Sequence, residues 1–405
     1  MRIPLVATLL LVACGGSNAA QDAAVDSFTA SDAPPTFGAR MPVAIAADPT
    51  DILASPKGMA IAWDNDPNLT SIETFFDSYG KSTAWSDATA EYGIGPLANT
   101  ATRSAGSAAP AMVAEADLLG LLTANLTAAK WGVPDESTIY MFFIPVGTKV
   151  DDGTGSFTCT DYDGYHFDTM INGVDIAYSI SASCHAEATQ LGITDLNDLM
   201  ITAGHEAVEA VTDPRTAFVD KLGWGEVDDA HSAFEYVTEG ELADLCEYAS
   251  TEDWIAPPGM AYSVQRSWSN KAAAAGHDPC VGEAHTTYYQ TIPDDPDPGV
   301  VNFGGRDQHT AGTKIAVGAT GAIRLQVYAD TAGAGPFKVE AFDLDGVLTF
   351  PTQPTGTFMP GDKLTIPVTV NKTAGRIAGA EVYEIDTTPV SGGGPTTSWY
   401  AYVVQ

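Results

Sequence analysis

Between residue 41 and residue 288, apolar positions follow two patterns that alternate along the chain. Nearly unbroken apolar runs at 59–64, 137–147 and 174–180 are typical of buried strands. The stretches at 71–85 and 115–132 instead space their apolar residues at helical intervals, which predicts two amphipathic helices. Strands that alternate with helices pack as layers, so this part of the chain is predicted to be one mixed α/β domain of the α+β class.

The pattern changes after a segment at 289–301 that is rich in Pro and Asp and is predicted to be a linker. Residues 302–405 contain short runs of alternating apolar and polar side chains, separated by Gly, Pro, Asn and Asp. This texture predicts a C-terminal all-β sandwich domain. By analogy of fold alone, its expected role is structural or adhesive, for example toward a polysaccharide.

The first 14 residues are interpreted as an export signal. Arg2 precedes an apolar stretch at 3–13 that is too short to cross a bilayer as a helix. The stretch ends in "LVAC", which resembles the lipobox of bacterial lipoproteins, so Cys14 is predicted to carry lipid and residues 15–40 to form a flexible tether. The alternative is a simple signal peptide with a chance cysteine. Both interpretations predict an exported protein, anchored to the bacterial cell envelope, at the outer membrane, or secreted.

Charge excludes one class of partner. The chain has 52 acidic and 18 basic residues among 405, for a formal charge of -34, which would repel nucleic acid and anionic lipid. We therefore expect no nucleic-acid partner, membrane contact only through the lipid anchor, and a soluble monomer.

Four cysteines remain after Cys14. An even number in an exported chain predicts two disulfides, and sequence order favours Cys159 with Cys184 and Cys246 with Cys280 among the three pairings. A cysteine-ligated zinc site is the rival interpretation, but no CxxC pair is present.

The stretch "ITAGHEAVEAVTDP", residues 201–214, carries the candidate chemistry. It is predicted to lie on a helix that Asp195 caps and that ends at Asp213. His205 and Glu209 at i and i+4 would project from one face and could ligate one metal ion, with Glu206 beside them as the general base. The alternative is an ordinary charged helix, because an HExxE string also arises by chance.

A catalytic site needs a third ligand. Glu241 is the first choice, on a second short helix that also carries Asp244 at i+3, and Asp244 could instead hold His205 through its other ring nitrogen. His166 is the rival, since two histidines and one glutamate match catalytic zinc better; its alternative is a structural loop histidine. Zinc is the predicted ion, and manganese, iron or calcium would also be compatible.

Several motifs in one order carry a resemblance to a known family. Together they are similar to bacterial secreted relatives of the exordium, or phosphate-induced protein, family over about residues 55–285. The resemblance implies a zincin-like metallohydrolase domain, with the helix motif at His205, Glu206 and Glu209 and a downstream motif at Glu241, Asp244 and Cys246. The motifs are "ETFFDSYGKSTAW" (73–85), "EYGIG" (91–95), "GYH" (164–166), "IAYSISASC" (176–184), "GHEAVEAVTDP" (204–214), "GW" (223–224), "GELADLC" (240–246) and "VQRSWSN" (264–270).

These observations support two hypotheses. The first is a zinc-dependent hydrolase, most specifically a metallopeptidase acting on a peptide or protein, in which Glu206 accepts a proton from the metal-bound water. Tyr165, Tyr236 or Tyr248 could stabilise the oxyanion. The second is a non-catalytic cell-surface protein that binds calcium or a polysaccharide on the same scaffold.

Overall fold

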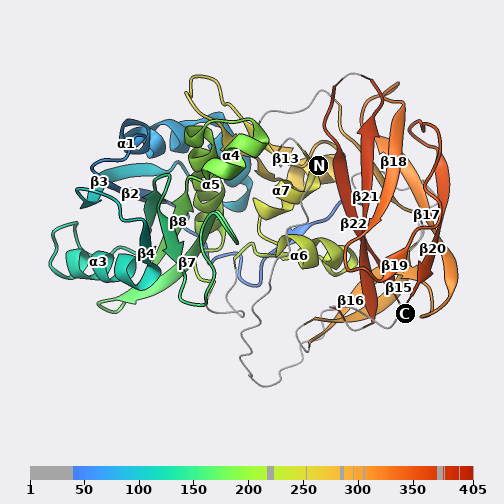
Figure 1. Cartoon of the computed structure of the whole chain (residues 1–405), viewed down its shortest axis with the longest axis horizontal. Coiled ribbons are helices and arrows are strands. Elements are labelled where there is room, and N and C mark those ends of the chain that lie inside the picture. The colour runs from blue at the N-terminus through green and yellow to red at the C-terminus, as the bar shows by residue number, and fades with distance from the viewer. Residues whose placement is uncertain are drawn as a thin grey trace.

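The computed structural model describes residues 40–216, 223–251, 253–282, 287–294, 296–303, 306–371, 377, 379–391 and 393–404. Cys14 and the predicted tether lie outside these residues. Figure 1 shows a mixed α/β lobe and a β lobe, with helices α6 (Ser232–Thr238) and α7 (Asp244–Ala249) between them. Among the described residues, no helix has both the length and the apolar character needed to span a membrane.

The α/β lobe is built on a five-stranded sheet with the strand order β3-β2-β5-β8-β7. The runs predicted as strands at 59–64, 137–147 and 174–180 correspond to β2, β5 and β8. Neighbouring strands are parallel from β3 to β8, whereas β7 pairs with β8 in the antiparallel direction at the sheet edge. The bounds are β2 (Lys57–Trp63), β3 (Ala98–Gly106), β5 (Thr138–Ile144), β7 (Gly164–Ile171) and β8 (Val174–Ala182).

Both faces of this sheet are covered, which explains the unbroken apolar runs. Along β5, Ile139, Met141 and Phe143 belong to one buried cluster, while Tyr140 and Phe142 belong to another. The first cluster includes residues of α1 (Leu69–Ser78), α2 (Thr83–Thr89) and α5 (Asp195–Thr212), and the second includes residues of α3 (Glu115–Thr127). Because successive side chains of a strand point to opposite faces of the sheet, β5 contributes to two hydrophobic cores.

The single helix predicted at 71–85 is in fact two helices. The chain turns through a short 3-10 segment, η2 (Tyr79–Lys81), in which Gly80 lies so close to Leu97 that a Cβ atom would be 2.5 Å from the Leu97 carbonyl oxygen. Ser82 then starts α2 by accepting a hydrogen bond from the Trp85 N–H at 3.1 Å.

Helix α5 runs across the first face of the sheet and carries the candidate motif. Its N-cap is Thr194, whose hydroxyl accepts from the Asn197 N–H at 3.1 Å, so the predicted cap at Asp195 is wrong by one residue. Asp213 is the C-cap, as predicted. The buried side of the helix is lined by Leu199, Met200, Ala203, Ala207 and Val211.

The β lobe contains a four-stranded sheet, β14-β17-β20-β19, and a five-stranded sheet, β15-β16-β22-β21-β18. All pairs are antiparallel except β16 with β22. The bounds are β14 (Tyr289–Pro293), β15 (Asp297–Phe303), β16 (Arg306–Lys314), β17 (Thr320–Ala329), β18 (Phe337–Asp343), β19 (Leu348–Thr349), β20 (Lys363–Val370), β21 (Ala380–Pro389) and β22 (Thr397–Val404).

The predicted linker at 289–301 forms strands. β14 and β15 are edge strands, one in each of the two sheets, and edges are where a sheet tolerates proline. The sheets contact each other through the hydrogen bond from Thr387 to Thr291 at 2.9 Å and the packing of Tyr289 on Phe337, with ring centroids 4.6 Å apart. The C-terminal β unit therefore begins at β14.

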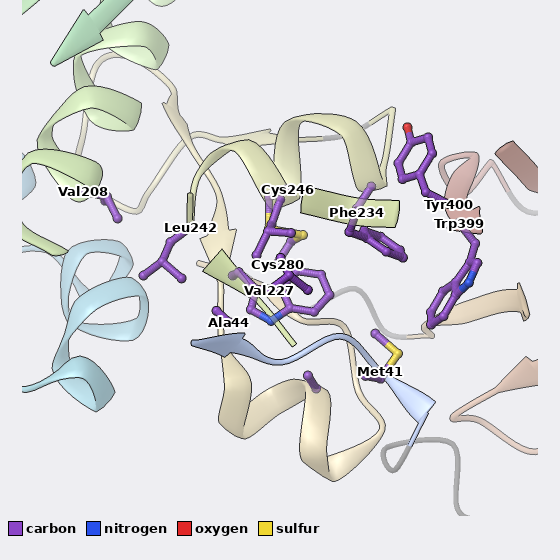
Figure 2. Close-up of a cluster of buried hydrophobic side chains, with 14 of the residues drawn as sticks. Met41, Ala44, Val208, Val227, Phe234, Leu242, Cys246, Cys280, Trp399 and Tyr400 are labelled. Atoms are coloured by element: carbon purple, nitrogen blue, oxygen red, sulfur yellow. A yellow bond between two sulfur atoms is a disulfide. The ribbon is translucent and has the colours of Figure 1, made fainter. Parts of the chain in front are cut away.

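The two lobes share one buried cluster. Figure 2 shows Phe234 of α6 beside Trp399 and Tyr400 of β22, with the Cys246–Cys280 disulfide close by. The Tyr402 hydroxyl also donates to the Ser232 carbonyl at 3.1 Å. Apolar packing and buried hydrogen bonds thus join the lobes.

Short elements complete the lobe that carries the candidate motif. They are the strand pairs β1 (Ala44–Ile45) with β9 (Glu226–Val227), β4 (Met112–Ala114) with β6 (Lys149–Asp151), β10 (Trp254–Ile255) with β11 (Val264–Gln265) and β12 (Ser267–Trp268) with β13 (Cys280–Val281), the helices α4 (His185–Leu191) and α8 (Asn270–Ala275), and the 3-10 turns η3 (Ala90–Tyr92) and η5 (Asp229–His231).

Candidate metal centre

Helix α5 brings Glu206 and Glu209 into the space between itself and the sheet edge. Both are buried, with exposed fractions of 3% and 2%. The sequence suggested a loop position for His166, but this residue lies in strand β7, 5% exposed, and faces the helix. The edge strand and the central helix therefore supply one site together.

His166, Glu206 and Glu209 form a buried group that could hold a metal ion. The His166 Nδ1 atom lies 3.7 Å from Glu206 Oε2 and 3.7 Å from Glu209 Oε2, too far for hydrogen bonds. Glu206 Oε2 is buried and has no hydrogen-bond partner in the part of the chain that the structure describes. Burying a carboxylate oxygen without a hydrogen-bond partner destabilises the folded protein. A cation bound between the three side chains would compensate this oxygen.

The backbone determines which nitrogen of His166 faces the carboxylates. His166 Nε2 lies 3.0 Å from the carbonyl oxygen of Asp213. A carbonyl only accepts, so Nε2 carries the hydrogen and Nδ1 is directed toward Glu206 and Glu209. A hydrogen bond of this kind on the far nitrogen is typical of metal-ligating histidines.

Gly164, at the start of β7, permits the close approach of the helix. A Cβ atom at this position would lie 2.6 Å from Thr202 Cγ2 and 2.7 Å from Glu206 Oε1. Any side chain here would displace Glu206, so the "GYH" sequence supplies both the ligand and the space beside it.

His205 lies on the other side of Glu209. Its Nε2 atom is 2.9 Å from Glu209 Oε2 and 3.3 Å from Asp244 Oδ1, and its Nδ1 atom is 3.7 Å from Glu247 Oε2. The side chains of His205, Asp244 and Glu247 form a second set whose ligand atoms lie close to one another. Glu247 was not predicted, although its position three residues after Asp244 on α7 places both on one helix face.

Glu241 contacts the centre from a different element than expected. It precedes α7 instead of lying on it, so the predicted i, i+3 pair with Asp244 on one helix is wrong. Glu241, Asp244 and Glu209 nevertheless form a third close group, and Glu241 Oε1 lies 3.6 Å from His166 Nε2. The Asp244 N–H donates to Glu209 Oε1 at 3.2 Å and so orients that carboxylate.

Charge and burial compete throughout this cluster. Burial would lower the pKa of His166, but the carboxylates of Glu241, Glu206 and Glu209 outweigh it and raise that pKa to about 10. Burial raises the pKa of Glu209 to about 7, and it raises the pKa of Glu247 to about 8. Without a cation, the cluster therefore retains protons near neutral pH, and a bound cation would take their place.

The donor set fits a divalent transition metal. Ligand atoms about 2.1 Å from one ion lie roughly 3 to 3.5 Å from each other, so the 3.7 Å separations around His166 need only a small inward movement. An imidazole with two carboxylates suits zinc, manganese or iron. Calcium prefers oxygen ligands alone, so the buried imidazole disfavours it.

The tyrosines proposed for an oxyanion are less well placed. Tyr165 lies on the opposite face of β7 from His166, where its ring packs against Tyr162 and Phe167. Tyr165 is therefore not at the centre. Tyr248 is closer to the cluster, because the Glu247 and Asp244 carboxylates, together with burial, raise the pKa of its hydroxyl.

The structure contains both disulfides in the pairing that sequence order favours, Cys159–Cys184 and Cys246–Cys280. Asp163 lies close to Cys159 and Cys184, but their sulfur atoms are bonded to each other and are not free metal ligands. Two disulfides fit an oxidising compartment, consistent with an exported protein.

Other histidines stand apart from the centre. His185, His231 and His277 each pair with a single aspartate, and His309 is exposed. His285 lies outside the described residues.

Comparisons with known proteins give little further information. No protein-family model matches the chain, and no curated protein matches it. Among solved structures, a conjugative transposon lipoprotein from Bacteroides eggerthii matches with 13% sequence identity and a TM-score of 0.17, covering 30% of this chain and 98% of its own. A TM-score of this size does not indicate a shared fold.

Proposed function

We propose that this protein is an exported, metal-dependent hydrolase, most specifically a zinc metallopeptidase, with the ion held by His166, Glu206 and Glu209. One observation carries the proposal: three buried ligand atoms face each other without hydrogen bonds between them, and one of them, Glu206 Oε2, has no hydrogen-bond partner among the described residues. When bound there, a divalent cation would polarise a carbonyl oxygen and lower the pKa of a water molecule.

The surrounding residues have separate roles in this scheme. The Asp213 carbonyl holds the His166 ring in place. His205 and the Asp244 N–H orient the Glu209 carboxylate. Glu241, whose side chain is 21% exposed, lies close to the Glu209 and Asp244 carboxylates, and we assign it the role of accepting a proton from the attacking water.

This scheme changes three of the roles that the sequence suggests. The sequence predicts His205 and Glu241 as ligands and Glu206 as the base. The buried contact with His166 instead favours Glu206 as a ligand, with His205 beside Glu209 and Glu241 as the base. We further propose that the chain is related to the exordium family. We also propose that Cys14 carries a lipid anchor and that the substrate is a peptide.

The substitutions Glu206→Gln and Glu241→Gln distinguish the two schemes. We expect Glu206→Gln to lower metal affinity at least 10-fold to 100-fold, the range for disturbed metal surroundings. We expect Glu241→Gln to retain the metal and lose about 100-fold to 10,000-fold in peptide hydrolysis, the usual contribution of a general base. Metal content by mass spectrometry and cleavage of a fluorogenic peptide library measure both effects.

His185→Gln is the matched control, because His185 is exposed and, among the described residues, its ion pair is with Asp195. Full metal content in Glu206→Gln, together with lost hydrolysis, would restore the assignment from the motif.

Burial of the group favours one alternative, a structural ion in a non-catalytic binding protein. Bound metal without hydrolysis of any peptide in the library would support that alternative.

A further inference from the structure

We propose that the centre holds two divalent cations that share Glu209 as a bridging ligand. This inference rests on the proposed metal-dependent function, because it adds a second ion beside the one held by His166 and Glu206. The second ion would be bound by His205 and Asp244, with Glu209 Oε2 common to both sets of ligands.

Both histidines approach that oxygen of Glu209. Glu209 Oε2 is 3.7 Å from His166 Nδ1 and 2.9 Å from His205 Nε2. Among the residues that the structure describes, no group of mutually close ligand atoms contains both histidines. A single ion would therefore bind one imidazole and leave the other without a metal, whereas two ions use both.

His205 Nε2 lies at suitable distances from both proposed partners, and the group of mutually close ligand atoms that contains His205 also includes Asp244 and Glu247. His205 Nε2 lies 2.9 Å from Glu209 Oε2 and 3.3 Å from Asp244 Oδ1. These separations match the roughly 3 to 3.5 Å expected between ligand atoms that surround one ion. Asp244 is presented by α7, which the Cys246–Cys280 disulfide connects to β13.

Charge supports the same conclusion. Five carboxylates surround the two imidazoles, and within the described part of the chain their ion pairs involve only these histidines. If all five carboxylates are ionised and both imidazoles are neutral, one divalent cation would leave three negative charges uncompensated, and two would leave one. Concentrated charge in a partly buried site is costly unless it is paired. The carboxylates belong to Glu206, Glu209, Glu241, Asp244 and Glu247.

A bridged pair has a defined chemical use. In hydrolases with two ions about 3.5 to 4 Å apart, the pair binds the nucleophile and the substrate oxygen together. A single oxygen of Glu209 that faces both histidines is the feature that would keep the ions at this separation.

Metal counting tests the inference without any assay of activity. The purified full chain is stripped with chelator, titrated with manganese chloride and examined by native mass spectrometry and electron paramagnetic resonance. We expect two manganese ions per chain with an exchange-coupled spectrum. Asp244→Asn should bind one ion and give an uncoupled spectrum, and the control His185→Gln should match the unsubstituted protein.

The outcomes separate this inference from the proposed function. One ion in the unsubstituted chain, with the same count in Asp244→Asn, would overturn the pair and leave the single-ion hydrolase intact. No bound ion would overturn both proposals. Two ions without coupling would place them far apart and would also overturn the shared Glu209. The result for the unsubstituted chain decides the matter even if a variant fails to fold.

Discussion

Asp163, directly before β7, is a half-buried carboxyl whose charge opposes folding. Burial and the neighbouring Glu187 carboxylate raise the pKa of Asp163 to about 9. A carboxyl with a higher pKa in the folded than in the unfolded chain stabilises the fold below its unfolded pKa, and this contribution is lost as the pH rises toward its folded pKa. Stability should therefore fall between about pH 4 and pH 9 on account of this residue.

The substitution Asp163→Asn removes the titrating group but keeps a polar side chain of the same shape. At pH 8 we expect the free energy of unfolding to rise by about 1 to 3 kcal/mol, because the amide does not have to take up a proton on folding as the carboxyl does. At pH 4 the gain should be small. Urea denaturation at both pH values measures this. Asp87→Asn on the exposed side of α2 is the control, and equal gains at the two pH values would refute the assignment.

Single residues also show what the sequence could reveal about the site. The i, i+4 spacing placed His205 and Glu209 correctly, because helix geometry is local. The contact of Glu206 with His166 depends on a strand 40 positions earlier and on the space left by Gly164, which no local pattern encodes. His166, Glu241 and Asp244 could therefore be proposed as candidates, but their arrangement around Glu209 could not.

At the scale of elements, α7 owes its position to a covalent link. The helix is six residues long, too short to be stable alone, and Cys246 connects it to Cys280. Replacing both cysteines with serine should cost about 2 to 4 kcal/mol of stability. It should also weaken zinc binding by roughly 10-fold or more, because Asp244 loses its fixed position beside Glu209.

The Cys159–Cys184 pair offers a matched control, since it closes a loop of similar length and lies outside α7. Its replacement with serine should cost similar stability with a smaller effect on zinc affinity. Urea denaturation and competition with a chromophoric chelator measure the two quantities. Equal losses of affinity in both double variants would show that the disulfide near α7 has no special role at the centre.

Elements were predictable where a local pattern determines them. The strands β2, β5 and β8 follow from their apolar runs, because a sheet covered on both faces requires them. The Pro and Asp composition of 289–301 failed as a linker signal, because edge strands tolerate the same residues. Whether such a segment joins a sheet depends on partners elsewhere in the chain.

At the scale of the whole molecule, the two lobes share a buried cluster that crosses between them. Phe234 of α6 is 1% exposed, and its ring centroid lies 5.1 Å from that of Trp399 and 5.3 Å from that of Tyr400. Removing either lobe would expose this apolar surface to water. Composition suggested two units with a linker, whereas the packing indicates one cooperative unit.

We therefore expect a single calorimetric unfolding transition, with equal calorimetric and van't Hoff enthalpies. Phe234→Ala should lower the stability of the entire transition by about 3 to 5 kcal/mol, the usual cost of such a cavity. Phe342→Ala is the control, because this ring is 41% exposed, and a surface change should cost roughly 0.5 kcal/mol or less. Two separate transitions, of which Phe234→Ala shifts only one, would show that the lobes fold independently and that the β lobe can act as a separate binding module.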